Sequence, residues 1–104
     1  MAAGDVTING RSGRSIRGIE VVSGTVVLDG SNPTPIAFSK PVLGGIVSFR
    51  AAAALALDPS SVSCSPSGNT LNVYAWKVTG QGDTTSIAST NNTAVVDFVA
   101  ILKA

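Results

Sequence analysis

Residues 19–50 read IEVVSGTVVLDGSNPTPIAFSKPVLGGIVSFR, and this stretch decides the fold class. Its apolar, β-branched runs at 19–28, 36–38 and 42–49 are separated by glycine and proline. Valine, isoleucine and phenylalanine favour strands, whereas the Asp-Gly and Asn-Pro pairs between the runs favour turns. The pattern predicts three successive antiparallel strands arranged as a meander.

The rest of the chain continues this alternation of short strands and turns. A hairpin turn is predicted at residues 66–69 (PSGN) and another turn at residues 91–93 (NNT). Residues 51–57 (AAAALAL) are the one helical-looking piece, and seven residues are too few for an independent helix. Further strands are predicted at 62–64, 70–78, 84–90 and 94–102. We therefore predict an all-β protein, an antiparallel β-sandwich or jelly-roll-like barrel of six to eight short strands.

Residues 1–18 differ from the remainder and form a polar, Gly/Ser-rich segment. Arg11, Arg14 and Arg17 are spaced three apart in it, but the intervening glycines and serines argue against a helix. We predict an extended basic N-terminal arm that precedes a single β-sandwich domain at 19–104. A short strand at 6–8 with a turn at Asn9-Gly10 fits this arm. Three interpretations stand: the three arginines contact an acidic surface of a neighbouring subunit, they contact nucleic acid, or the arm is a solvated terminus. Three arginines alone are weak evidence for nucleic acid.

Several positions carry specific structural expectations. Gly44-Gly45 within an apolar run predicts a bulge or a close backbone approach. The last strand, 94–102, is apolar on both faces, so it must be central in a sheet or covered. Asp97 within it is expected to pair with Arg50 or Lys77, or to lie at an exposed rim, and Cys64 is expected to be a small buried strand residue.

Tyr74 and Trp76 are the single tyrosine and tryptophan of the chain. Because they alternate with Leu71, Val73 and Ala75, they are expected on the face of their strand that points away from the core. Such a pair of rings serves a subunit interface or a ligand surface, or packs across strands within the sheet.

Composition points to assembly rather than catalysis. Only 12% of the 104 residues are charged, against about 25% in an ordinary domain, which predicts that part of the surface is buried in an oligomer. The net charge of +1 predicts neither nucleic-acid nor membrane binding, and no apolar run reaches 18 residues. The opening MAAGD shows no basic-then-apolar leader, so we expect a protein that is made and assembled in a cytoplasm.

None of the usual catalytic constellations is present in the sequence. There is no histidine to act as a general base, and none of the three lysines completes a Ser-x-x-Lys motif. One cysteine excludes an internal disulfide and a cysteine zinc cage, and no calcium-loop pattern occurs. The expectation is a protein that is not an enzyme and that binds no metal or cofactor.

Three stretches resemble known families. Residues 23–38 (SGTVVLDGSNPTPIAF), 71–79 (LNVYAWKVT) and 96–101 (VDFVAI) resemble small virion proteins of tailed bacteriophages. The second half also resembles the H-type lectin pattern, in which a Leu/Ile-Asn-Val-x-Ala strand is followed by a final strand with an aromatic residue and Ala-Ile. Phe98 stands where that family often has tryptophan, so no sugar-binding residue is carried over.

The phage resemblance implies a structural protein of the virion. A chain of this size fits a capsid decoration (cement) protein, which sits as a homotrimer over junctions of the major capsid protein and stabilises the head. The lectin resemblance implies the alternative, a carbohydrate- or receptor-binding module of a phage tail or virion surface. Either role places the protein at the virion surface after assembly in the host cytoplasm.

Overall fold

The computed structural model describes residues 2–12, 18–50, 58–80, 82 and 85–103. Within these residues there is no helix, and eight strands account for the regular structure. They are β1 (Val6–Arg11), β2 (Ile19–Val27), β3 (Thr34–Ala37), β4 (Val42–Phe49), β5 (Ser61–Ser67), β6 (Thr70–Lys77), β7 (Ile87–Ala88) and β8 (Val95–Lys103). The predicted all-β class and the number of strands are confirmed.

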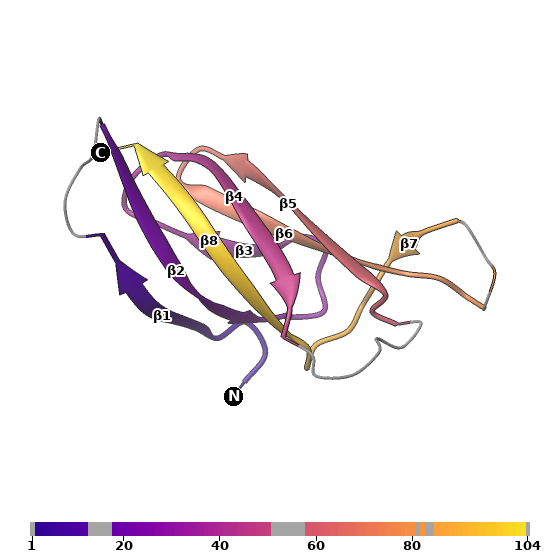
Figure 1. Cartoon of the computed structure of the whole chain (residues 1–104). Helices are drawn as coiled ribbons and strands as arrows, with labels where there is room; N and C mark the ends of the chain where they lie inside the picture. The colour runs from indigo at the N-terminus through magenta and orange to yellow at the C-terminus, as the bar shows by residue number, and fades with distance from the viewer. Residues whose placement is uncertain (1, 13–17, 51–57, 81, 83–84, 104) are drawn as a thin grey trace.

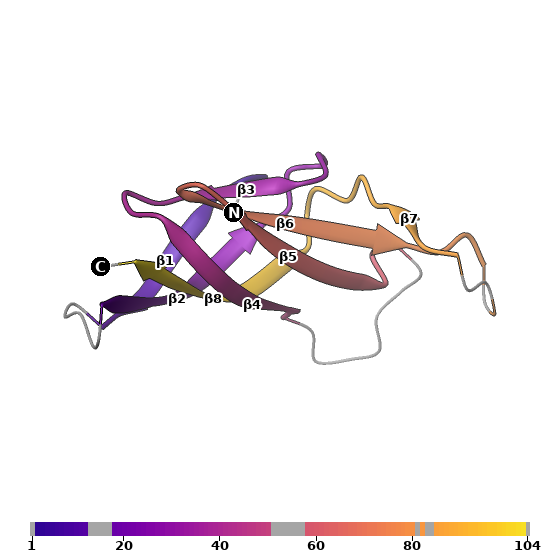
Figure 2. The same ribbon diagram turned by 90° about the horizontal axis from the view of Figure 1, so that it is seen from above.

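The strands form two antiparallel sheets packed as a β-sandwich. The first sheet has the order β1-β2-β8-β4, and we call it sheet A. The second, sheet B, has the order β3-β6-β5, with the short β7 pairing the far end of β6. Figure 1 shows β8 between β2 and β4, and Figure 2 shows the two layers from above. In both views β7 and the end of β6 extend beyond the other strands.

The core lies between the two sheets and is aliphatic apart from its phenylalanines. Alternate residues of β8 and β6 point into it, as the alternation in the sequence predicts. Phe38 and Phe98 meet edge to face across the core, with ring centroids 6.2 Å apart. The buried side chains of the core are Val22, Val26, Leu28, Ile36, Val42, Leu71, Val73, Ala75, Val96, Phe98, Ala100 and Leu102.

Close backbone approach explains two glycines of sheet A. A Cβ on Gly24 would lie 2.1 Å from the Thr7 carbonyl oxygen and 3.0 Å from the Phe98 ring. A Cβ on Gly45 would lie 3.0 Å from the Leu71 side chain and from the Val99 carbonyl oxygen. Of the two alternatives predicted for Gly44-Gly45, the close backbone approach is confirmed at Gly45, whereas the bulge lies one residue earlier, at Leu43, where the β4–β8 register shifts between Val42 and Gly44.

The meander predicted for 19–50 is wrong. β2 and β4 belong to sheet A, with β8 hydrogen-bonded between them, whereas β3 lies at the edge of sheet B. The chain therefore crosses from one sheet to the other after β2 and returns before β4. The sequence pattern specifies strands and their buried faces, but strand pairing depends on residues distant in the chain, and here the last strand takes the central place.

Within the N-terminal segment, β1 is extended, as expected, and it is paired within sheet A. Val6–Arg11 form the edge strand beside β2, with a register shift between Ile8 and Gly10. The turn expected at Asn9-Gly10 is therefore wrong, because the strand continues through both residues with a bulge. The bulge absorbs the extra residue without ending the pairing.

Three other local predictions have different outcomes. Of the strand predicted over 84–90, the described residues 85–90 contribute Ile87–Ala88, which pair with β6. The hairpin turn at 66–69 joins β5 to β6, and Gly68 has a φ of 59°. The short helix or loop considered for 51–57 lies outside the described residues.

A side chain of the loop between β2 and β3 forms a hydrogen bond with the edge of sheet B. The Asn32 side-chain oxygen accepts a hydrogen bond from the Ala75 backbone N–H at 2.9 Å, in the part of β6 between the residues that pair with β3 and those that pair with β7. In the same turn, Asp29 accepts hydrogen bonds from the Ser31 backbone and from the Ser31 and Thr34 hydroxyls. Gly30 has a φ of 86°, as its place in an Asp-Gly corner predicts.

Candidate functional site

The outer faces of the two sheets are the candidate binding surfaces of this molecule. The described residues enclose no pocket, and they bring no group of three histidine, cysteine or acidic side chains together. None of them forms a helix that is long and apolar enough to cross a membrane. A binding role must therefore be argued from the surface of the sandwich.

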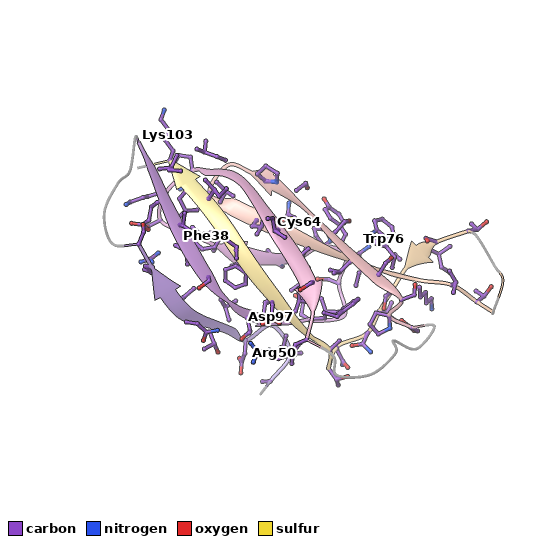
Figure 3. All side chains as sticks on the ribbon, viewed as in Figure 1. Phe38, Arg50, Cys64, Trp76, Asp97 and Lys103 are labelled. Carbon is purple, nitrogen blue, oxygen red and sulfur yellow. The ribbon has the colours of Figure 1, made fainter. Side chains whose placement is uncertain are left out.

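Tyr74 and Trp76 lie on the outer face of sheet B, as predicted. Both are half-buried, and their rings are nearly parallel, with centroids 6.1 Å apart and an interplanar angle of 12°. The indole Nε1–H of Trp76 donates a hydrogen bond to the Ser63 hydroxyl at 3.0 Å. This contact ties the Trp76 ring to β5, and Figure 3 shows Trp76 at the end of the sandwich near β7.

A row of hydroxyl groups lies beside the two rings. Residues directly opposite each other in an antiparallel pair point to the same face of the sheet. On β5 and β6 the opposed pairs on this face are Ser61 with Trp76, Ser63 with Tyr74, Ser65 with Asn72, and Ser67 with Thr70. We call these eight residues the hydroxyl-aromatic face. It carries no charged side chain.

The outer face of sheet A has a different character. Val21 lies opposite Ile101 on β8, and Ile46 lies opposite Val99. Ile46 is 71% exposed, the largest value among the exposed large hydrophobic residues, and Leu43 in the β4 bulge is 53% exposed. We call these five residues, Val21, Leu43, Ile46, Val99 and Ile101, the aliphatic face. Exposed β-branched side chains gathered on one sheet are typical of an interaction surface.

Of the three arginines of the arm, the structure describes Arg11. Arg11 ends β1, and its Nε lies 3.8 Å from the buried carboxylate of Glu20 in the same chain. Lys40 approaches that carboxylate from the other side at 3.2 Å. Arg14 and Arg17 lie outside the described residues, so their predicted contact with a neighbour stays a prediction.

Asp97 pairs with Arg50, the first of the two partners proposed for it. The Arg50 guanidinium donates from Nη2 at 2.7 Å and from Nε at 3.0 Å to one carboxylate oxygen. The hydrogen bonds and the charge of Asp97 raise the pKa of Arg50. The pair lies at one end of the aliphatic face, where β4 and β8 run side by side (Figure 3). The geometry is that of a structural ion pair, not of a general acid or base.

Lys77, the other partner considered for Asp97, contacts Asp58 instead, at 3.9 Å. Asp58 also accepts a hydrogen bond from the buried hydroxyl of Ser89. Because Ser89 is 2% exposed, its oxygen is closed to a substrate, and the cluster joins β7 to the segment before β5.

Cys64 lies on β5 and packs against the core, as expected for a small apolar strand residue. It is half-buried, and its thiol donates to the Gly45 carbonyl oxygen at 3.4 Å. Burial raises the pKa of the thiol, which disfavours the reactive thiolate. Cys64 therefore has a structural role between β5 and β4.

Sequence reasoning found the aromatic pair but missed the aliphatic face. The aliphatic face could have been expected from residues 19–28 and 94–102, which are apolar on both faces of their strands. A strand with two apolar faces exposes one of them unless a partner covers it. Which residues lie together there depends on the order β2-β8-β4, and a local sequence pattern does not specify strand order.

Comparison with protein-family models, with curated proteins and with solved structures finds no match to this chain. The function is therefore argued from its two outer faces.

Proposed function

We propose that this protein is a non-enzymatic structural protein that works by assembly, most specifically a capsid decoration (cement) protein of a tailed bacteriophage. In this role it forms homotrimers, binds the major capsid protein over subunit junctions and stabilises the head. It acts at the virion surface after assembly in the host cytoplasm. The aliphatic face carries the proposal, together with the resemblance of residues 23–38, 71–79 and 96–101 to phage virion proteins.

The aliphatic face has few charged groups, and this favours its burial against a partner. Its centre holds valine and isoleucine side chains, and the charged groups of the register lie at its two ends, Asp97 with Arg50 at one and Lys103 at the other. Burying such a face lowers the free energy by about 25 cal/mol for each Å² of apolar surface that is removed from water. A subunit with 12% charged residues gains stability from that burial and has little charge repulsion to overcome.

Binding only to the assembled lattice would stabilise the lattice by mass action. A cement protein needs only to bind the assembled lattice more tightly than free capsid subunits. The absence of a catalytic constellation in the sequence is consistent with this role.

Co-sedimentation with expanded phage shells that lack decoration proteins tests the proposal. We expect saturable binding in multiples of three per junction, and an Ile46→Asp variant that folds but binds at least tenfold more weakly. The matched control is Ile87→Asp, which changes an exposed isoleucine on β7, away from the aliphatic face. Absence of binding to every shell tested would overturn the cement role.

The alternative function is a carbohydrate- or receptor-binding module of a phage tail or virion surface. The parallel rings of Tyr74 and Trp76 favour it, and their face belongs to the other sheet. Since the two faces are on opposite sides of the sandwich, one function does not exclude the other.

A further inference from the structure

We propose that the hydroxyl-aromatic face of sheet B binds an extended, neutral polysaccharide, with Tyr74 and Trp76 as the stacking residues. The inference names the ligand class and the residues of the alternative function. It does not depend on the assembly of the protein through sheet A.

The first argument is the arrangement of the two rings. Residues two apart on a strand are separated by about 6.6 Å, so two aromatic side chains at such positions follow the strand axis. The nearly parallel planes and the 6.1 Å centroid separation form an ordered pair along β6. The C–H groups of a sugar ring pack on aromatic rings, and successive rings along a strand suit successive units of a chain.

The second argument is the row of polar groups beside the rings. The four serines of β5 and the side chains of Thr70 and Asn72 can each donate or accept a hydrogen bond. Sugar hydroxyls need both kinds of partner. Ser63 already accepts from the Trp76 indole, so the tryptophan is held in place before a ligand arrives, and less side-chain entropy is lost on binding.

The charge and composition of the hydroxyl-aromatic face favour a saccharide over a protein partner. The hydroxyl-aromatic face has no charged side chain, which matches a neutral polymer and offers nothing to an anionic one. Four serines in one row are unusual for a protein interface, because serine is depleted there while apolar and arginine side chains are enriched. The aliphatic face of sheet A has the composition expected for protein contacts instead.

The fourth argument is shape. The described residues enclose no pocket, so a single sugar unit would remain mostly solvated. A chain that lies along β6 over several units gains contacts with both rings and with the serine row. We therefore infer binding to polymers or long oligosaccharides, and much weaker binding to monosaccharides.

The experiment measures retention of the intact protein on cellulose, chitin and starch granules, with alginate and heparin beads as the anionic probes. We expect retention on at least one neutral polymer and none above background on the anionic beads. The matching hexasaccharide should shift the emission of Trp76, the single tryptophan of the chain.

Two variants connect the binding to this face. Trp76→Ala should lower the retained fraction at least fivefold. Ser61→Asp keeps both rings but places a charge opposite Trp76, and it should lower retention by a similar factor. Ser61 is exposed on β5, so this variant tests the proposal even where Trp76→Ala fails to fold.

Ile46→Asp separates this inference from the assembly function. It should lose shell binding and keep polysaccharide retention, because Ile46 lies on sheet A. Retention on no polymer, retention only on anionic beads, or full retention by a folded Ser61→Asp variant would each overturn the polysaccharide site and leave the assembly proposal standing.

Discussion

Glu20 is the most enclosed acidic residue that the structure describes. It is 8% exposed at the rim of the core, and Lys40 and Arg11 approach it from two other segments, at 3.2 and 3.8 Å. Arg11 was predicted to contact a neighbouring subunit, and its contact with Glu20 gives it a partner within its own chain. At the scale of single residues, the scarce charges of this chain are placed mainly in pairs.

Replacing Lys40 by methionine should destabilise the fold by about 1–3 kcal/mol, because the buried carboxylate of Glu20 then loses its closer charged partner. The free energy of unfolding in urea measures the effect. Asp97→Asn is the matched control. It breaks the Arg50 pair, in which the side chains are 61% and 38% exposed, and exposed pairs contribute little to stability. Equal losses for the two variants would contradict this account of Glu20.

Asp29 predicts a dependence of stability on pH. Partial burial raises the pKa of Asp29, but hydrogen bonds from Ser31 and Thr34 outweigh it, and the net pKa is lowered. A lowered pKa in the folded state means that the carboxylate stabilises the fold above the ordinary aspartate pKa of about 4. That stabilisation is lost as the pH falls through the lowered pKa.

Urea unfolding of the wild type and Asp29→Asn between pH 2 and pH 7 checks this prediction. The difference in stability should be largest at pH 5–7 and should shrink below about pH 4. A difference that is constant over the whole range would show that the ionised carboxylate contributes nothing.

At the scale of elements, the bulges of β1 and β4 shape the two edges of sheet A. β1 shifts register between Ile8 and Gly10, and β4 shifts between Val42 and Gly44. Bulges at sheet edges increase twist and discourage further strand pairing. Sheet A therefore offers its outer face for contacts more readily than its edges.

Gly24→Ala should disrupt the β1–β2 edge. The added methyl group meets the Thr7 carbonyl oxygen and the Phe98 ring, neither of which can move freely. We expect a loss of about 1–3 kcal/mol, the usual cost of overpacking, with faster amide hydrogen exchange in β1. Gly44→Ala is the control, since a Cβ there meets nothing within 4 Å, and its effect should stay within about 0.5 kcal/mol. Similar losses for both glycines would contradict the steric explanation.

At the scale of the whole molecule, the sandwich has two chemically distinct sides. The aliphatic face and the hydroxyl-aromatic face belong to different sheets, with the core between them (Figure 2). A protein built in this way can attach through one side and present the other.

Self-association should depend on the aliphatic face. In sedimentation velocity, we expect the wild type to form oligomers at micromolar concentration and Ile46→Asp to sediment as a monomer, because a buried carboxylate without a partner is costly. Ile87→Asp should associate like the wild type, since Ile87 lies on β7. A monomeric wild type over the accessible concentration range would remove the homotrimer from the proposal and restrict the aliphatic face to another partner.

The sequence by itself determined the strands, the two faces of each and much of the turn chemistry. The alternation in 71–75 identified the core residues of β6, because side chains in a strand point to opposite faces in turn. In 96–102 the alternation separated the two faces of β8 without showing which of them is buried, since both are apolar. The close backbone approach at Gly45 and the Asp29-Gly30 corner were also predictable, since glycine is the residue that a close approach and a left-handed turn favour. The placement of Tyr74 and Trp76 away from the core followed from the same alternation.

Only the tertiary structure decided how these strands are ordered and what the two outer faces contain. The meander failed because β8, the last strand, pairs between β2 and β4. Such pairing joins residues that are 47 (Phe49 and Val96) to 84 (Ile19 and Lys103) positions apart in the chain, and local patterns carry no information about it. The aliphatic face exists because that order brings Val21, Ile101, Val99 and Ile46 together. The serine row lies beside the aromatic pair because the β5–β6 register sets Ser63 opposite Tyr74. Pattern fixes which side of a strand is buried, whereas register between distant strands fixes which exposed side chains become neighbours.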